Sequence, residues 1–226
     1  LNIKCVSTSD ASTEQAKSLG FRDHDVLLGT DEGPFKEFIN VNGDFFRQIA
    51  KAKRVDIIRN GKRMSIKLPG DLDMLSMIKA DPIFVRPYIP SEVDSLIPAA
   101  EAQQSGMALT NGKTPAELAG IKAGDRILAI NGHSVDSWGK FNYQLNVLGD
   151  VLKADKTAKD SLATRTVTLV SRHNGAANAD TSRVVLSPDL KLGVYQSNFA
   201  DYYKETHETY GFLASIPAGI TYGLNT

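Results

Sequence analysis

The chain repeats part of its own sequence at a spacing of 100 residues, and this repeat restricts its possible folds more than any other feature. Residues 16–28 (AKSLGFRDHDVLL) and residues 116–128 (AELAGIKAGDRIL) share four identical positions and two further apolar ones. Each copy is followed by a helix-like stretch and then by a paired-strand pattern. Repeats at a fixed period indicate that one structural unit occurs more than once. Two small modules therefore fit the 226 residues better than one continuous fold.

The second copy begins with signals for a short helix. Thr114 is followed three residues later by Glu117, which is the pattern of a capping box, and Pro115 stands at the first helical position. Gly120 is suited to the end of that helix, because a left-handed conformation costs glycine little.

A turn and a strand are expected next. Gly124 permits a tight turn, and the Asp125 carboxylate can accept backbone N–H groups within it. Residues 126–130 (RILAI) are too apolar for simple alternation and predict a largely covered strand. Asn131-Gly132 is a strong tight-turn pair.

A longer helix is predicted after the pair Asp136-Ser137, which can cap it. The spacing of its large apolar residues gives one helical face, made of Trp138, Phe141, Leu145 and Leu148. Gly149 is expected to end the helix, and the polar residues 150–164 to form a surface insertion. Further strands are predicted at residues 165–171, 182–186 and 192–196.

The first copy gives a similar but thinner pattern. We expect strands at residues 1–7, 25–28 and 82–86, a helix ending at Leu19 and a short helix containing Phe45, Phe46 and Ile49. A hairpin is predicted at residues 54–59 and 63–68, joined by the Asn60-Gly61 turn.

Composition excludes several classes of protein. The 26 basic residues balance the 26 acidic ones, which argues against a nucleic-acid partner. One cysteine, Cys5, cannot form an internal disulfide or a Cys-rich zinc site. No Gly-x-Ser-x-Gly motif occurs, and the string nearest to HExxH, residues 207–211 (HETYG), lacks the second histidine. We therefore expect no catalytic residue, metal ligand or cofactor site in this chain.

The ends of the chain suggest an excised piece. It opens on Leu1 without a signal peptide, and residues 209–226 carry no charge but several aromatic residues. Two interpretations of this tail stay open: a C-terminal segment docked on the protein, or a juxtamembrane segment that precedes a membrane helix.

Residues 117–135 (ELAGIKAGDRILAINGHSV) strongly resemble the PDZ family signature, in which a short helix leads into Ala-Gly-Leu-x-x-Gly-Asp-x-Ile-Leu-x-Val-Asn-Gly. The first copy departs from this signature, since His24 stands where the family has glycine. Gly29-Thr30-Asp31 also replaces the Asn-Gly turn. The groove strand of the second copy looks as if it comes last, which resembles the circularly permuted PDZ domains of bacterial envelope proteases.

Together with the tail (YGFLASIPAGITYGLNT), this order resembles the segment between two membrane helices of the RseP class of site-2 intramembrane zinc metalloproteases. The resemblance implies a mainly β fold with short helices (α+β), made of two tandem circularly permuted PDZ-like domains. Each would be a partly open β-barrel with capping helices. The implied division is a first domain at residues 1–88, a second at residues 89–198 and a juxtamembrane segment at residues 199–226.

The resemblance also implies a role. The segment would lie on the periplasmic face of a bacterial inner membrane, attached through flanking helices outside this chain. It would gate or recognise trimmed membrane-protein substrates, of the anti-sigma-factor type, for regulated intramembrane proteolysis. The zinc of such an enzyme belongs to its membrane part, which this chain does not include. The alternative is a PDZ peptide-binding or scaffold module of an HtrA-like envelope protease or an adaptor.

A PDZ module binds the C-terminal or extended peptide of its partner as an added strand. In the second copy the strand edge would be formed by Leu192, Gly193, Val194, Tyr195 and Gln196. The facing helix would contribute Trp138, Phe141 and Leu145, although Phe141 and Leu145 can equally be wholly internal. In the first copy the edge would be formed by Ile83, Phe84 and Val85, opposite the short helix at residues 45–49.

Overall fold

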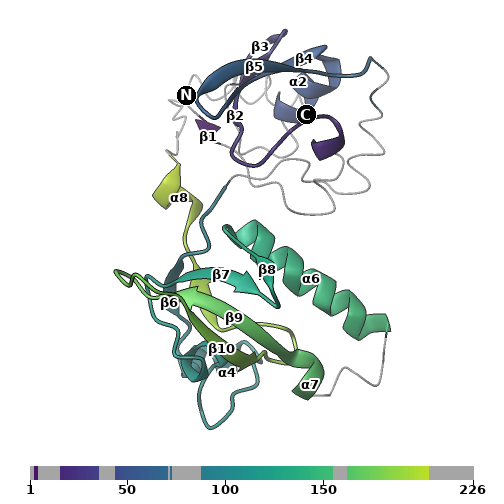
Figure 1. Cartoon of the computed structure of the whole chain (residues 1–226). Helices are drawn as coiled ribbons and strands as arrows, with labels where there is room; N and C mark the ends of the chain where they lie inside the picture. The colour runs from purple at the N-terminus through teal and green to yellow at the C-terminus, as the bar shows by residue number, and fades with distance from the viewer. Residues whose placement is uncertain are drawn as a thin grey trace, which may run out of the picture.

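The computed structural model describes residues 3–4, 16–35, 44–70, 72, 88–154 and 162–203 (Figure 1). The described chain is mainly β with a few short helices, and its strands form open sheets. Most of its buried apolar residues fall into two separate clusters, one for each of the larger sheets.

The first sheet has the strand order β1-β2-β4-β5, with β3 paired to β2. Its strands are β1 (Ile3–Lys4), β2 (Val26–Thr30), β3 (Gly33–Pro34), β4 (Arg54–Arg59) and β5 (Lys62–Lys67). Helix α2 (Asp44–Lys51) packs on it through Ile49, which is buried beside Phe21, Leu27 and Ile57. The expected hairpin is confirmed, and Asn60 and Gly61 have the positive φ angles of a tight primed turn.

The second sheet has the order β10-β9-β7-β8, and a separate two-stranded sheet pairs β11 with β6. The strands of the second sheet are β7 (Arg126–Ile130), β8 (His133–Ser134), β9 (Thr166–Arg172) and β10 (Asp180–Val185). The two-stranded sheet consists of β6 (Val93–Leu96) and β11 (Val194–Gln196). Between β6 and β11 the chain forms the helices α4 (Ala99–Gln104), α5 (Pro115–Leu118), α6 (Trp138–Ala154) and α7 (Leu162–Arg165). Helix α8 (Phe199–Tyr202) follows β11.

The sequence repeat is also a structural repeat. A β-bulge interrupts the pairing of β2 with β4 between Leu27 and Gly29, and the pairing of β7 with β9 between Ile127 and Ala129. Backbone hydrogen bonds recur at the same spacing, for example from Phe21 N–H to the Ala16 carbonyl and from Ile121 N–H to the Ala116 carbonyl. The two larger sheets therefore share a common local framework.

The repeated aspartate is buried in both copies but has a different partner in each. Asp25 accepts two hydrogen bonds from the Arg59 guanidinium, both at 2.7 Å. Asp125 lies 2.7 Å from Nδ1 of His173 instead. Each carboxylate also accepts a hydrogen bond of 2.8 Å from the backbone N–H three residues earlier, which belongs to Arg22 in the first copy and to Lys122 in the second. The expected Asp125 turn is therefore confirmed.

The predicted start of the second copy is confirmed in detail. The Thr114 side chain accepts a hydrogen bond from Glu117 N–H, and the Glu117 carboxylate accepts one from Thr114 N–H. Gly120 ends the short helix α5 with a φ of +74°. Asn131 and Gly132 form the predicted turn between β7 and β8.

The predicted end of the long helix is wrong. Helix α6 passes through Gly149 without a positive φ and continues to Ala154. The extra turn buries Leu152, while an isolated glycine in a helix interior costs only about 1 kcal/mol. Residues 150–154 therefore belong to α6 and not to a surface insertion, and residues 162–165 form α7.

Replacing Gly149 with alanine is expected to raise the free energy of unfolding by about 0.5–1 kcal/mol, because alanine favours a helix interior more than glycine does. An added Cβ would lie 3.5 Å from Cδ1 of Leu190, which is an ordinary van der Waals contact. Urea unfolding followed by the fluorescence of Trp138, the single tryptophan, measures the change. A destabilised variant would contradict the helical assignment of Gly149.

The remaining predicted strands differ from the structure or lie outside the described residues. Strand β6 was not predicted, and β11 begins at Val194, two residues later than expected. The predicted strand at residues 82–86, with Ile83, Phe84 and Val85, lies outside the described residues, as do Cys5 and residues 204–226. The side chains of Phe45 and Phe46 also lie outside them.

A polar contact joins the turn before β2 to the start of α6. The Lys140 ammonium lies 2.8 Å from the Asp23 carboxylate and 2.9 Å from that of Asp136. Burial lowers the pKa of Lys140, but the hydrogen bonds to the two carboxylates outweigh it and leave the pKa raised.

His24 has a φ of +65° at the position where the second copy has Gly124. Its ring packs edge-on against Tyr88 and lies 3.4 Å from the Asp136 carboxylate. The histidine in the place of glycine thus makes contacts that glycine could not.

Candidate functional site: a groove between helix α6 and strand β11

Helix α6 is anchored to the second sheet at its first turn. Ser137 accepts a hydrogen bond from Lys140 N–H and so caps the helix. Trp138 and Phe141 are each 2% exposed and pack edge to face, with ring centroids 5.4 Å apart. Trp138 Nε1 also donates to the Glu92 carbonyl. These contacts fix the first turn of α6 against the core. Another side of the helix is left to line the cavity described below.

The loop before β11 has a defined shape. Ser187 accepts a hydrogen bond from Lys191 N–H through its hydroxyl, and its carbonyl accepts one from Leu190 N–H. Leu190 has a φ of +59°, a conformation that costs a residue with a Cβ about 1–2 kcal/mol. Burial raises the pKa of Asp189, but hydrogen bonds from Lys191 and Ser187 outweigh it and hold the pKa below its usual value. The loop is therefore held by its own polar side chains.

Gly193 packs directly against Thr114, the first residue of the capping box. Its φ is +90°, and a Cβ at this position would lie 2.7 Å from Cβ of Thr114. The Leu192 carbonyl accepts a hydrogen bond from Ala116 N–H, and the Gly193 carbonyl accepts one from Ile97 N–H. Glycine is required here because the backbone passes directly over the buried Thr114 side chain.

Strand β11 has one paired edge and one open edge. Its paired edge faces β6, and the register places Val194 opposite Leu96. Because antiparallel strands alternate the direction of their hydrogen-bonding groups and Gly193 bonds toward β6, the N–H and C=O of Val194 point away from β6. Within the described ranges, no other strand pairs with this second edge.

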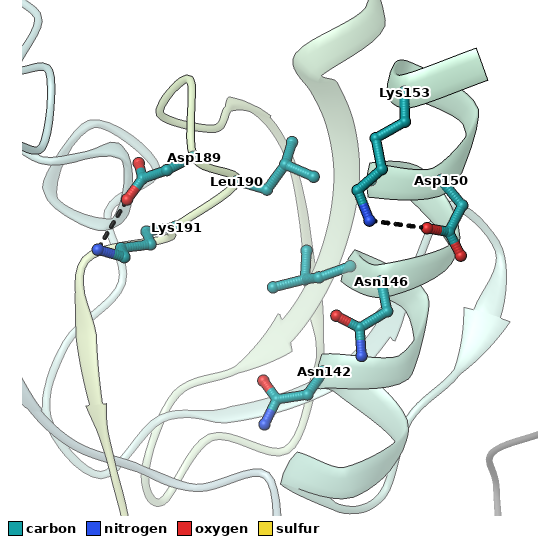
Figure 2. Close-up of a pocket in the computed structure, with 9 residues that line it drawn as sticks. Asn142, Asn146, Asp150, Lys153, Asp189, Leu190 and Lys191 are labelled. Atoms are coloured by element: carbon teal, nitrogen blue, oxygen red, sulfur yellow. Dashed lines mark hydrogen bonds and ion pairs between the residues drawn. The ribbon is translucent and has the colours of Figure 1, made fainter. Parts of the chain in front are cut away.

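A cavity of about 600 Å³ lies between α6 and the loop before β11. Figure 2 shows Asn142 and Asn146 projecting from α6 toward the loop that carries Asp189, Leu190 and Lys191. The complete lining is Asn142, Leu145, Asn146, Gly149, Asp150, Lys153, Asp189, Leu190 and Lys191. The four charged groups are two ion pairs, Asp150 with Lys153 and Asp189 with Lys191, so the rim carries no net charge.

The structure separates the residues predicted for the helix side of the groove. Leu145 lines the cavity, whereas Trp138 and Phe141 belong to the buried core. Their side chains are enclosed because they fix α6 to the sheet, which for Phe141 agrees with the alternative that it is wholly internal. Whether Leu145 contacts a peptide stays a prediction.

The residues predicted for the strand side lie along β11 and its loop. Leu192 is buried in the core, and Val194 is half-buried at the open edge. The Tyr195 hydroxyl donates to the Glu101 carboxylate of α4, and this hydrogen bond raises the pKa of Tyr195. The Gln196 side chain is hydrogen-bonded to that of Asn142 on α6. Tyr195 and Gln196 thus already have partners.

Sequence reasoning missed most of the polar lining on α6. Asn142, Asn146, Gly149, Asp150 and Lys153 follow one another at intervals of one, three or four residues along one side of the helix. Ending the helix at Gly149 removed Asp150 and Lys153 from consideration. A helical projection continued to Lys153 would have shown this polar side next to Leu145.

The part of the chain that the structure describes shows neither a candidate metal cluster nor a candidate membrane span. No cluster of three or more His, Cys, Asp or Glu side chains is close enough there to hold a metal ion. None of the helices formed by these residues has the length and apolar character needed to cross a membrane.

A family model for the PDZ domain matches residues 112–156. A PDZ domain is found there. The matched residues span α5, β7, β8 and α6, which are the capping box, the core strand and the groove helix described above. PDZ domains generally bind peptides by adding them as a strand. The chain as a whole matches no curated protein.

Proposed function

We propose that this chain binds the end of a polypeptide in the groove between α6 and β11. The observation that carries the proposal is the open edge of β11, where Val194 N–H and C=O point away from β6. The cavity beside this edge provides the room that an added strand and its side chains require. The PDZ domain at residues 112–156 supports the same use of α6 as the facing wall.

The chemistry of the groove fits a peptide chain. The ligand backbone would exchange hydrogen bonds with Val194, and an aliphatic side chain would enter the cavity beside Leu145 and Leu190. Among the described residues, the N–H groups of Leu192 and Gly193 have no hydrogen-bond partner. Adjacent backbone N–H groups of this kind suit a carboxylate.

The wider proposal concerns the parent protein. We infer two tandem circularly permuted PDZ-like domains that control access to an intramembrane zinc metalloprotease of the RseP class. The repeated bulges and the position of β11 after β10 support the tandem and the permuted order. The sequence of the tail supports the protease class. Bulk alone would suffice to exclude large substrates, while the groove would recognise the new C-terminus of a trimmed one.

A scaffold module of an HtrA-like envelope protease or an adaptor is the second candidate, and the PDZ domain favours it equally. The parental reading frame distinguishes the two. An HExxH motif within an apolar stretch upstream supports the intramembrane protease, whereas a trypsin-like domain supports the second candidate. For the first candidate, removal of the segment should allow the full-length enzyme to cut an intact substrate as well as a pre-trimmed one.

A peptide with a free C-terminus is expected to shift the amide NMR signals of Val194 and Leu145. Leu145→Glu should abolish these shifts, because a carboxylate would be placed in the apolar part of the cavity. Val147→Glu is the matched control, since Val147 lies on the exposed side of α6. Trp138 fluorescence checks that both variants are folded. Unchanged wild-type spectra at millimolar peptide would reject peptide binding and leave exclusion by bulk.

A further inference from the structure

One pair of side chains joins the two walls of the groove directly. Nε2 of Gln196, on β11, donates to Oδ1 of Asn142, on α6, at 3.0 Å, and Nδ2 of Asn142 lies 3.4 Å from Oε1 of Gln196. The two amides thus form a reciprocal pair between the strand and the helix. Asn142 is also part of the cavity lining, whereas Gln196 is not, so the cavity ends at this pair.

The Asn142–Gln196 amide pair lies on the path that a longer peptide would follow along β11. A strand added to β11 bonds first with Val194, and its next position of the same kind is two residues farther, beside Gln196. At about 3.3 Å per residue, the stretch from the Gly193 loop to Gln196 holds about three extended residues. The fourth residue from the end of a bound peptide would therefore meet the amide pair.

We propose that the Asn142–Gln196 pair is a latch across the peptide groove, which leaves room for the last three residues of a chain and must open for longer ligands. This inference rests on the proposed peptide binding at the same site. The loop of Asp189, Leu190 and Lys191 bounds the other end of the cavity. A groove bounded at both ends admits a chain end more easily than the middle of a chain. The loop end of the groove thus favours a newly cut C-terminus over an uncut loop, and the latch limits how far the bound chain extends along β11.

The latch is suited to opening because both side chains lie at the surface. Gln196 is exposed, and water can satisfy both amides once they separate. A hydrogen bond of this kind has a modest net contribution to stability. The pair should therefore tune affinity and ligand length without preventing binding.

The test compares two peptides that share their last three residues. The tripeptide Ala-Leu-Val and a nonapeptide of alanine and serine that ends in Ala-Leu-Val are titrated into the whole chain, and dissociation constants are measured by NMR. Asn142→Ala and Gln196→Ala should each bind the nonapeptide about 3- to 10-fold more tightly than the wild type, since neither has the latch to open. Gln196→Ala, whose side chain lies outside the cavity lining, should bind the tripeptide with unchanged affinity. Gln144→Ala, which removes an amide of α6 outside the cavity lining, should alter neither affinity.

The side-chain NH₂ signals of Asn142 and Gln196 give a second readout. Both should shift with the nonapeptide, whereas the Gln196 signal, from outside the cavity lining, should stay in place with the tripeptide. Weaker nonapeptide binding by Asn142→Ala, or equal changes for both peptides, would overturn the latch while leaving peptide binding intact. Failure of the wild type and of every variant to bind either peptide would reject the proposed function and the latch with it. Binding of the nonapeptide by the latch variants alone would support both.

Discussion

Replacing Gly193 with alanine is expected to lower the free energy of unfolding of the second sheet by about 2–5 kcal/mol. The φ of +90° strains any residue that has a Cβ. The new Cβ would also lie 2.7 Å from Cβ of Thr114, which is fully buried and holds the capping box of α5. Cβ of Thr114 is fixed to the backbone, so rotation of a side chain cannot relieve the contact. Either α5 or the loop before β11 must move.

Gly175→Ala is the matched control for this variant. Gly175 has a φ of +76°, but nothing lies within 4 Å of the position that its Cβ would take. It should therefore show the backbone strain of about 1–2 kcal/mol without the steric contact. Urea unfolding followed by Trp138 fluorescence measures both variants, because Trp138 lies in the core of the second sheet. Equal losses of stability would show that the approach to Thr114 has no energetic consequence.

Replacing Asp25 with alanine is expected to destabilise the first sheet by about 2–4 kcal/mol. The change leaves the Arg59 guanidinium, which is 15% exposed, without its carboxylate partner. It also removes the acceptor of Arg22 N–H. The hydrogen bonds with Asp25 raise the pKa of Arg59 in spite of burial. Without Asp25 the guanidinium still keeps its charge, because the ordinary pKa of arginine lies far above neutral pH.

Asp56→Ala is the control for Asp25→Ala, since Asp56 bonds to Arg54 and Ser65 at the exposed surface of the same sheet. It should cost less than about 1 kcal/mol. The measurement is urea unfolding followed by the amide signal of Ile57, which is buried in the first core. Asp25→Ala should shift this transition and leave the Trp138 transition in place. A common shift of both would show that the two sheets unfold as one cooperative unit.

The two copies show how much local structure follows from a short motif. The capping box at Thr114, the left-handed Gly120 and the Asp125 turn depend on neighbours within a few residues, so the sequence predicts them correctly. The same argument placed the hairpin at Asn60-Gly61. The partners of the two buried aspartates could not be predicted in this way, because Arg59 and His173 approach from 34 and 48 residues away.

The groove was only partly accessible to sequence reasoning. Leu145 and the segment of β11 were chosen by the periodicity of α6 and by the PDZ resemblance. Phe141 has the same spacing as Leu145, yet it is enclosed with Trp138 in the core. Hydrophobic periodicity marks the buried face of a helix but does not show where that face stops touching its own sheet and begins to line a cavity.

By itself the sequence determined the repeated framework, its turns and caps, and the PDZ domain of the second copy, because each depends on the chemistry of residues close together in the chain. Tertiary structure alone decided that α6 continues through Gly149, that β11 pairs with β6, and that Gln196 reaches Asn142. These features join segments that are far apart in the sequence, or depend on the burial of Leu152 outweighing the low helix preference of one glycine. The shape of the groove is therefore a property of packing, although most of the elements that form its walls can be read from the chain.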